Sequence, residues 1–314
     1  MILTVTMNPS IDTRYQVDDF VIDDVNRVIP AKTAGGKGLN VSRVLLQLGD
    51  EVLATGMIGG HTGDYMEDLM DEDGIPHSFT RIEGETRSCV NILHQGNQTE
   101  LLENGPEVST GELQVFFDHY ASMLSGVDCV TLSGSLPCGV RSDCYIDLIC
   151  MAQDAGIPVL LDTSGDAMVA ALTSSVKPTL IKPNLSELNG FFDRAWSSSD
   201  IEEIYRAIKT DDRFSGIEWV MISMGSAGSI AIHNGDDVYR VTQPPISAVN
   251  ATGSGDATIG GFAHAIAAGM DSVSILKYGN SCGKLNAMDP KTGHIPINRW
   301  DEVFDSVSVE RLVL

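Results

Sequence analysis

One carboxylate stands directly after two glycines in the stretch VNATGSGDATIGGF, which continues as a predicted helix. The backbone N–H groups of Gly253, Ser254 and Gly255 would lie at the helix start, where the positive end of the helix dipole favours an anion. Asp256, in the first turn, could then remove a proton from an attacking hydroxyl while these amides stabilise a transferred phosphoryl group. Taken alone, the motif favours the alternative, an ordinary helix start at which Asp256 only interacts with the dipole.

A second glycine-rich stretch, TAGGKGLNVSR, precedes another predicted helix. Gly36 permits close approach of a ligand to the backbone, Lys37 supplies a point charge, and Asn40 lies one turn further along. This combination suits a polyhydroxylated, phosphorylated ligand, although a plain strand-to-helix turn would have the same sequence. In NPSID, Asp12 follows the first predicted strand and could accept hydrogen bonds from two sugar hydroxyls, with an Asx turn as the alternative.

Several common enzyme motifs do not occur in the sequence. There is no His-Glu-x-x-His and no Gly-x-Ser-x-Gly. TAGGKGLN is not a phosphate-binding P-loop because glycine follows Lys37, and GSGDAT has Thr258 where the dinucleotide fingerprint requires a third glycine. These patterns argue against a Walker NTPase and against a Rossmann dehydrogenase.

Composition limits the partners and the location. The chain of 314 residues carries a formal net charge of −23, which would repel nucleic acid and anionic membranes. The apolar stretch MILTVT has no basic flank and is too short for a signal or membrane helix, so it is predicted to be a buried first strand. Six cysteines form no Cys-x-x-Cys pair, which indicates reduced thiols, with a zinc site as the remote alternative. We therefore expect a cytoplasmic protein.

Short apolar runs alternate with helix-period segments along most of the chain, as in ILTVT, EVLATGMI, VDCVTLS and PVLLD. This rhythm predicts a mostly parallel central sheet with helices between its strands. Capping-box spacings predict helix starts at Ser109 and Ser199, and Asn234-Gly235 predicts a hairpin. The length suits one large α/β domain over residues 1–314.

Two segments depart from this rhythm. Residues 12–33 and 87–103 show strand-like alternation interrupted by polar turns. They predict a small sheet standing off the main layer, which could act as a lid. An ordinary edge hairpin is the alternative.

Six motifs occur in the order found in one known family. They are TMNPSID, AGGKGLNVSRVLLQLG, SGSLPCG, IKPNLSEL, ISMGSAGS and NATGSGDATIGGF. Together they resemble the ribokinase-like sugar kinases of the phosphofructokinase B family over essentially the whole chain. The forms of NPSID, GGKGLNVSR and GETRSCVNILHQGNQTE resemble the branch of that family that acts on sugar phosphates.

The resemblance implies a three-layer, Rossmann-like α/β fold with a small β-sheet lid, and a homodimer formed through the lid. It also implies ATP-dependent phosphorylation of a ketohexose phosphate to the bisphosphate, with ATP and Mg²⁺ as cofactors. Tagatose 6-phosphate is the expected substrate, and fructose 1-phosphate and fructose 6-phosphate are alternatives. Less favoured are a kinase for a neutral sugar or nucleoside and a catalytically silent sugar-phosphate sensor, which would need neither the carboxylate nor the glycines of GSGD.

The resemblance further implies roles for individual residues. Asp256 would be the general base, and the anion hole would consist of Gly253, Ser254 and Gly255. Residues that match sugar-phosphate-binding positions are Asp12, Arg27, Gly36, Lys37, Asn40, Arg87 and Asn91. Residues that match nucleotide-binding positions are Lys182, Asn184, Ser223, Gly225, Gly228 and Asn280. Glu187 would contact Mg²⁺, through water because this cation dehydrates reluctantly.

Three positions depart from the usual family pattern. Ser254 and Ala257 replace a more frequent alanine and serine, but neither change removes a backbone amide or the carboxylate. Cys138 stands where relatives can carry a lysine facing the substrate. This last difference bears on which sugar phosphate fits.

Overall fold

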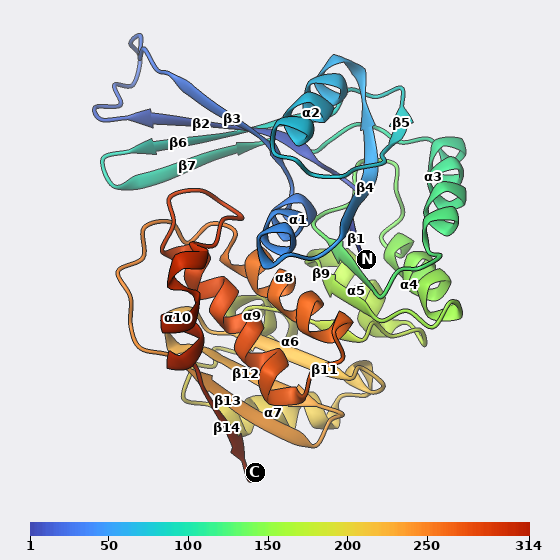
Figure 1. Cartoon of the computed structure of the whole chain (residues 1–314), viewed down its shortest axis with the longest axis vertical. Coiled ribbons are helices and arrows are strands. Elements are labelled where there is room, and N and C mark those ends of the chain that lie inside the picture. The colour runs from blue at the N-terminus through green and yellow to red at the C-terminus, as the bar shows by residue number, and fades with distance from the viewer.

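A ten-stranded sheet forms the centre of the computed structural model, which describes all 314 residues (Figure 1). The strand order is β14-β13-β12-β11-β10-β9-β8-β1-β4-β5. Strands from β11 to β5 pair in parallel, and β12, β13 and β14 add an antiparallel edge. The strands are β1 (Ile2–Thr6), β4 (Val52–Gly59), β5 (Thr80–Ile82), β8 (Cys129–Ser133), β9 (Val159–Asp162), β10 (Leu180–Ile181), β11 (Trp219–Ser223), β12 (Ser229–His233), β13 (Asp237–Thr242) and β14 (Ser308–Leu312).

Helices cover both faces of this sheet. They are α1 (Lys37–Leu48), α2 (Gly60–Glu72), α3 (Thr110–Met123), α4 (Cys144–Asp154), α5 (Gly165–Thr173), α6 (Leu185–Phe192), α7 (Ile201–Thr210), α8 (Ser254–Ala267), α9 (Ser272–Ala287) and α10 (Trp300–Ser306). Three short 3₁₀ turns are η1 (Asp212–Phe214), η2 (Gly225–Ala227) and η3 (Ile297–Arg299). No helix is long and apolar enough to cross a membrane.

The layers follow from the alternation of side chains along each strand. Leu3 and Leu161 belong to the core cluster under α3 to α7, whereas their neighbours Ile2 and Leu160 belong to the cluster under α1, α8 and α9. A strand that is apolar on both faces can be buried only between two helical layers. The three-layer, Rossmann-like α/β fold predicted from the sequence is therefore confirmed.

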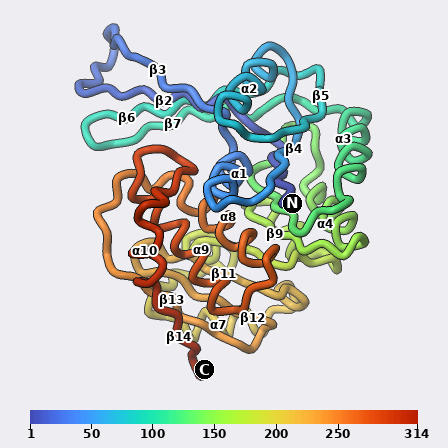
Figure 2. Tube along the Cα trace, in the orientation of Figure 1, coloured from blue at the N-terminus to red at the C-terminus, as the bar shows by residue number.

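The two segments that broke the βαβ rhythm form a separate four-stranded sheet. Its strands are β2 (Ser10–Val17), β3 (Pro30–Gly35), β6 (Arg87–His94) and β7 (Asn97–Leu102), in the order β3-β2-β6-β7. β2 and β6 pair in parallel, so the blue and teal segments run side by side although they are far apart in the sequence (Figure 2). The predicted second sheet is present, and the alternative of an isolated edge hairpin is wrong.

Local signals for helix starts and turns succeed in two cases and fail in one. Ser109 and Glu112 form the predicted capping box, with each backbone N–H bonded to the other side chain. Asn234 and Gly235 have the positive φ angles, 50° and 74°, that the predicted hairpin turn requires. The prediction of a helix start at Ser199 is wrong by one residue, because the N-cap of α7 is Asp200. The carboxylate of Asp200 instead accepts a hydrogen bond from the backbone of the serine three residues earlier.

Candidate active site

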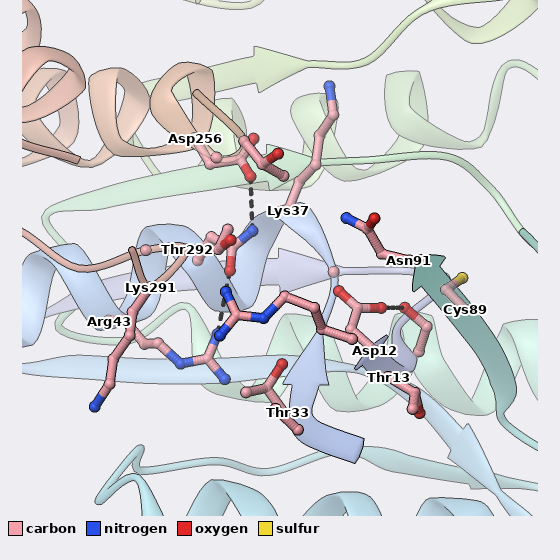
Figure 3. Close-up of a pocket in the computed structure, with 18 of the residues that line it drawn as sticks. Asp12, Thr13, Thr33, Lys37, Arg43, Cys89, Asn91, Asp256, Lys291 and Thr292 are labelled. Atoms are coloured by element: carbon pink, nitrogen blue, oxygen red, sulfur yellow. Dashed lines mark hydrogen bonds between the residues drawn. The ribbon is translucent and has the colours of Figure 1, made fainter. Parts of the chain in front are cut away.

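A cavity of about 800 Å³ separates the small sheet from the starts of α1 and α8 (Figure 3). β2, β3, β6 and β7 contribute to one wall, and the loop after α9 contributes to another. Eight residues predicted from the sequence line the cavity: Asp12, Gly36, Lys37, Asn40, Arg87, Asn91, Gly253 and Asp256. The fold therefore brings together most of the predicted sugar-binding residues and the predicted base.

Glycines keep the start of α8 open. Gly253 precedes the helix with φ of 79°, and a Cβ at this position would overlap the side chain of Thr292. A Cβ on Gly255 would lie 3.1 Å from Nζ of Lys182. At Gly253, only glycine combines the left-handed backbone with so close an approach to Thr292. The first amides of α8 and the Lys182 ammonium thus occupy the same small region, which favours an anion.

Asp256 is buried in the first turn of α8, with an exposed fraction of 7%. One carboxylate oxygen accepts a 2.8 Å hydrogen bond from Nδ2 of Asn40. Burial, followed by the negative charge of Asp162, raises the pKa of Asp256 to about 6, although Lys37 and Lys182 act in the opposite direction. A carboxylate with this pKa is ionised at neutral pH and is more basic than an exposed one, as a general base requires.

Asp162 lies between two lysines at the end of β9 and was not identified from the sequence. Its oxygens are 3.3 Å from Nζ of Lys37 and 3.5 Å from Nζ of Lys182. Burial acts to raise the pKa of Asp162, but the charges of Lys182 and Lys37 outweigh it and lower that pKa. In turn, Asp162 and Asp256 raise the pKa of Lys37, although burial acts to lower it.

A sequence signal for Asp162 exists. It is the last residue of the apolar strand PVLLD, and carboxyl ends of parallel strands are where α/β proteins build their sites. In Figure 3 the side chain of Lys37 runs past Asp256 and away from Asp12, and its Nζ lies 3.3 Å from the carboxylate of Asp162. Lys37 therefore belongs to the cluster around Asp162 more than to the wall formed by the small sheet.

Polar side chains of the small sheet form the opposite wall. Asp12 accepts a 2.6 Å hydrogen bond from Oγ of Ser10, and burial raises the pKa of its carboxyl. Oδ1 of Asn91 is buried and has no hydrogen-bond partner within the protein. Buried polar atoms normally have partners. Asn91 itself lines the cavity, so its side-chain amide is a candidate partner for a hydroxyl of a ligand there.

Arg87 lines the cavity, but its guanidinium is already engaged. It donates two hydrogen bonds to the carbonyl of Asn8, at 3.2 and 2.9 Å, and one of 2.9 Å to the carbonyl of Glu103. These acceptors are uncharged, so the positive charge of Arg87 is not neutralised by a carboxylate there. Arg27, in contrast, is exposed in the loop between β2 and β3 and does not line this cavity.

The predicted nucleotide-binding residues gather around the ends of β10 and β11. Asn184 and Glu187 form a capping box at the start of α6, with both hydrogen bonds at 2.8 Å. Asn184 also forms a parallel bridge with Ser223, which ends β11. The Asn-x-x-Glu spacing thus has a structural explanation of its own, while the exposed side chains of both residues stay at the surface of this region.

Gly225, Gly228 and Asn280 lie beyond β11. Gly225 begins η2, and Gly228 ends the turn that leads into β12. Asn280 is buried in α9, where its amide donates to the carbonyl of Leu276 and accepts from Oγ of Ser229 at 2.9 Å. The bond from Ser229 attaches α9 to the start of β12, so Asn280 supports this region through packing.

No group of three or more His, Cys, Asp or Glu side chains is arranged to hold a metal ion. Mg²⁺ that accompanies a nucleotide needs only one or two carboxylates, because phosphates and water supply its other ligands. Glu187 provides one exposed carboxylate at the start of α6. The donor set therefore fits a metal carried in with ATP and does not resemble a preformed metal centre.

Three further cavity-lining cations were not singled out from the sequence: Arg14, Arg43 and Lys291. Cys138, considered from the sequence as a substrate-facing position, does not line the cavity, whereas Cys89 on β6 does. Figure 3 shows Arg43 and Lys291 across the cavity from Cys89 and Asn91. Only the pairing of β2 with β6 reveals that Cys89 lies beside Asp12.

A family model described as pfkB family carbohydrate kinase matches residues 8–298. The chain belongs to the pfkB family of carbohydrate kinases. It is an ATP-dependent sugar kinase of the phosphofructokinase-like type. The matched range contains the four strands of the small sheet and every residue that lines the cavity.

Solved structures described as phosphofructokinases, or as candidates for that activity, superpose along nearly the whole chain. A candidate phosphofructokinase from Staphylococcus aureus is 30% identical, with 99% of each chain covered and a TM-score of 0.82. A candidate 1-phosphofructokinase from Thermotoga maritima is 25% identical, with 100% of each chain covered and a TM-score of 0.85. Phosphofructokinase-2 from Escherichia coli is 23% identical, with 97% and 98% covered and a TM-score of 0.87, and it shares the fold.

Proposed function

We propose that the protein transfers the γ-phosphoryl group of ATP to a primary hydroxyl of a ketohexose phosphate, giving the bisphosphate. Tagatose 6-phosphate is the substrate we favour. The observation that carries the proposal is the buried carboxylate of Asp256, with a pKa raised to about 6 at an open helix start inside the cavity. A sugar-phosphate sensor needs neither this base nor the open amides.

In the proposed reaction, a carboxylate oxygen of Asp256 takes the proton of the sugar hydroxyl as its oxygen attacks the γ-phosphorus of ATP. The bond from that phosphorus to the β–γ bridging oxygen breaks, and ADP leaves with the electron pair. The amides of Gly253, Ser254 and Gly255 and the ammonium of Lys182 stabilise the charge on the transferred group. The proton on Asp256 then returns to solvent.

For the nucleotide, we propose binding by Lys182, Asn184, Ser223, Gly225 and Gly228, with Asn280 supporting the wall. Glu187 would hold Mg²⁺ through water, and the cation would neutralise phosphate charge when bound. The clustering of these residues at the carboxyl ends of β10 and β11 supports this assignment.

For the sugar, we propose that Asp12, Asn40 and Asn91 bind hydroxyls, Gly36 allows close approach, and Arg87 attracts the phosphate. The E. coli relative phosphofructokinase-2 has been described in complex with fructose 6-phosphate. The decisive experiment is an ADP-release assay with ATP and Mg²⁺ that compares kcat/KM for tagatose 6-phosphate, fructose 1-phosphate, fructose 6-phosphate, ribose, fructose and a nucleoside. Turnover of neutral substrates alone would overturn the sugar-phosphate assignment, and no turnover would favour a sensor.

We expect Arg87→Ala to raise KM for the phosphorylated sugar by about 10- to 100-fold, the range for loss of a hydrogen bond to a charged group. KM for the corresponding neutral sugar should change much less. Arg87→Lys is the matched control, because it keeps the charge but loses the three hydrogen bonds to carbonyls. Equal losses for both sugars in Arg87→Ala would mean that Arg87 acts only by holding the small sheet in place.

We also propose that residues 1–314 form one cytoplasmic kinase domain, that the small sheet acts as a lid, and that two lids pair in a homodimer. Exposed apolar side chains on the small sheet and its loop support the pairing: Val21, Ile22, Val25, Ile29, Leu101 and Leu102. Phosphofructokinase-2 from E. coli is described in a tetrameric inhibited form, so oligomers of other sizes occur in the fold.

Leu101→Lys should shift the dimer toward monomer in sedimentation velocity. The introduced charge would have to be buried without a partner, which costs several kcal/mol. Val313, exposed at the opposite end of the molecule, provides the control substitution Val313→Lys, which should leave the dimer intact. A Leu101→Lys variant that sediments like the wild-type dimer would contradict pairing through the lid.

A further inference from the structure

Arg43, on α1, connects three parts of the cavity wall. Nη1 donates to Oδ1 of Asn40 at 3.2 Å, and Nη2 donates to the carbonyl of Ala34 on β3 at 2.6 Å. Nε donates to Asp73, after α2, at 2.9 Å. The Arg43 side chain is largely buried, with 14% of it exposed. Neither the sequence motifs nor the proposed reaction assigns it a role.

We propose that Arg43 is a positioning residue for the reaction: it fixes the orientation of the Asn40 amide, and through it the carboxylate of Asp256. Asn40 accepts from Arg43 through Oδ1 and donates to Asp256 through Nδ2 at 2.8 Å. The chain of contacts therefore runs from the guanidinium to the amide and from the amide to the carboxylate. The inference rests on the proposed role of Asp256 as general base.

The chemistry of the three groups determines the direction of the amide. A guanidinium only donates and an ionised carboxylate only accepts, whereas an amide has one end of each kind. If the Asn40 amide were turned around, its oxygen would face the carboxylate of Asp256 and its NH₂ would face the guanidinium of Arg43. Both contacts would be repulsive, so Arg43 and Asp256 together hold a single orientation.

The orientation of the Asn40 amide matters for the basicity of Asp256. Asn40 donates a hydrogen bond to one oxygen of the same carboxylate that must accept the substrate proton. A hydrogen bond donated to the charged form lowers the pKa of a carboxyl. Other charges facing Asp256 are Asp162 at the end of β9, Lys37 on α1 and Lys182 after β10. Loss of Arg43 leaves these groups in place and frees the Asn40 amide to rotate, so the pKa of Asp256 should rise.

The carboxylates near Arg43 offer a way to distinguish a positioning role from a purely structural role of this arginine. Asp73 forms the ion pair with Arg43, and the positive charge of Arg43 also acts on Asp12 of β2. Asp73→Asn would weaken the ion pair but leave the hydrogen bonds of Arg43 to Asn40 and Ala34. A structural role would make the Asp73 and Arg43 variants alike, whereas a positioning role would not.

The test is the pH dependence of kcat/KM between pH 5 and 9 for the full-length wild type, Arg43→Met, Arg43→Lys and Asp73→Asn, with ATP, Mg²⁺ and the best sugar substrate. We expect Arg43→Met to lose up to about tenfold in kcat, the scale of one hydrogen bond, and to move the acidic limb up by about half to one pH unit. Arg43→Lys should recover part of both changes, and Asp73→Asn should leave the limb unmoved.

An acidic limb that stays in place in Arg43→Met, or that moves equally in Asp73→Asn, would overturn the positioning role. If Arg43→Met does not fold, the comparison of Arg43→Lys with Asp73→Asn decides the question in the same way. A wild type that is active but has no acidic limb near pH 6 would overturn the base assignment for Asp256. The wild-type pH profile therefore tests the role of Asp256 as general base, and the variants separately test the positioning role of Arg43.

Discussion

Asp256→Asn is expected to lower kcat by about 10²- to 10⁴-fold, the usual range for loss of a general base. Affinity for ATP and for the sugar should be largely unchanged, because asparagine keeps the size of the side chain and an acceptor for Nδ2 of Asn40. Steady-state kinetics and calorimetric binding to the same samples check both halves of the expectation. Turnover close to that of the wild type would remove Asp256 from the role of base.

The pH dependence supplies a control for this variant. With a pKa of about 6, Asp256 is the active base above that pH, so wild-type kcat/KM should fall as the pH drops through 6. The variant should lack this limb. A carboxyl pKa raised from 3.8 to about 6 also means that folding disfavours the charged form by about 3 kcal/mol.

The sign of this term predicts the stability of the same variant. A group that binds its proton more tightly in the folded state stabilises the protein as the pH falls from about 6 toward 4, and costs stability above 6. Asp256→Asn removes that cost and should be at least as stable as the wild type at pH 8. A thermal melt at pH 8 therefore excludes misfolding as the reason for lost activity.

Asp162→Ala is expected to lower the free energy of unfolding by about 3–5 kcal/mol, measured by urea denaturation at pH 7. Removing one partner of a buried ion pair leaves an uncompensated charge. Here Lys182 is the partner most affected, because only 7% of its side chain is exposed, against 42% for Lys37. A loss below about 1 kcal/mol would contradict the assignment of Asp162 as the counter-charge of this cluster.

A double variant tests the cause of the loss. Lys182→Met removes the buried ammonium, so Asp162→Ala should cost much less in a Lys182→Met background than in the wild type. The single variant Asp162→Ala also has a kinetic signature. Because the charge of Asp162 raises the pKa of Asp256, removing it should move the acidic limb of kcat/KM to lower pH. This direction is opposite to that expected for Arg43→Met.

The sequence was sufficient where the governing interactions are local. The capping box at Ser109 and the turn at Asn234-Gly235 involve residues at most three apart, and both form as predicted. The alternation of apolar strands with helix-period segments indicated the mostly parallel central sheet, whereas the three layers were implied by the family resemblance. The error at Ser199 is also local: the helix begins one residue later, after Asp200, whose carboxylate accepts two hydrogen bonds from Ser197.

Many of the residues singled out from the sequence line the cavity, because glycine-rich strand-to-helix connections place backbone amides and side chains within one turn. Gly36, Lys37 and Asn40 line the cavity as their spacing suggested, and Gly253 and Asp256 lie opposite the small sheet. Arg27 does not line the cavity, and neither do Ser254 and Gly255. The segment of Arg27 forms the loop between β2 and β3, and nothing in the spacing showed how far that loop extends from the cavity.

By itself, the sequence predicted the central parallel sheet, the two segments that depart from it, the glycine-rich helix starts and the carboxylate at one of them. Only the tertiary structure decided which charges meet: Lys37 pairs with Asp162, 125 residues away, and Asn40 with Asp256, 216 residues away. Electrostatic interaction depends on distance in space and on burial. A sequence encodes these two quantities only through the packing of the whole sheet, so the basicity of Asp256 could be read only from the folded chain.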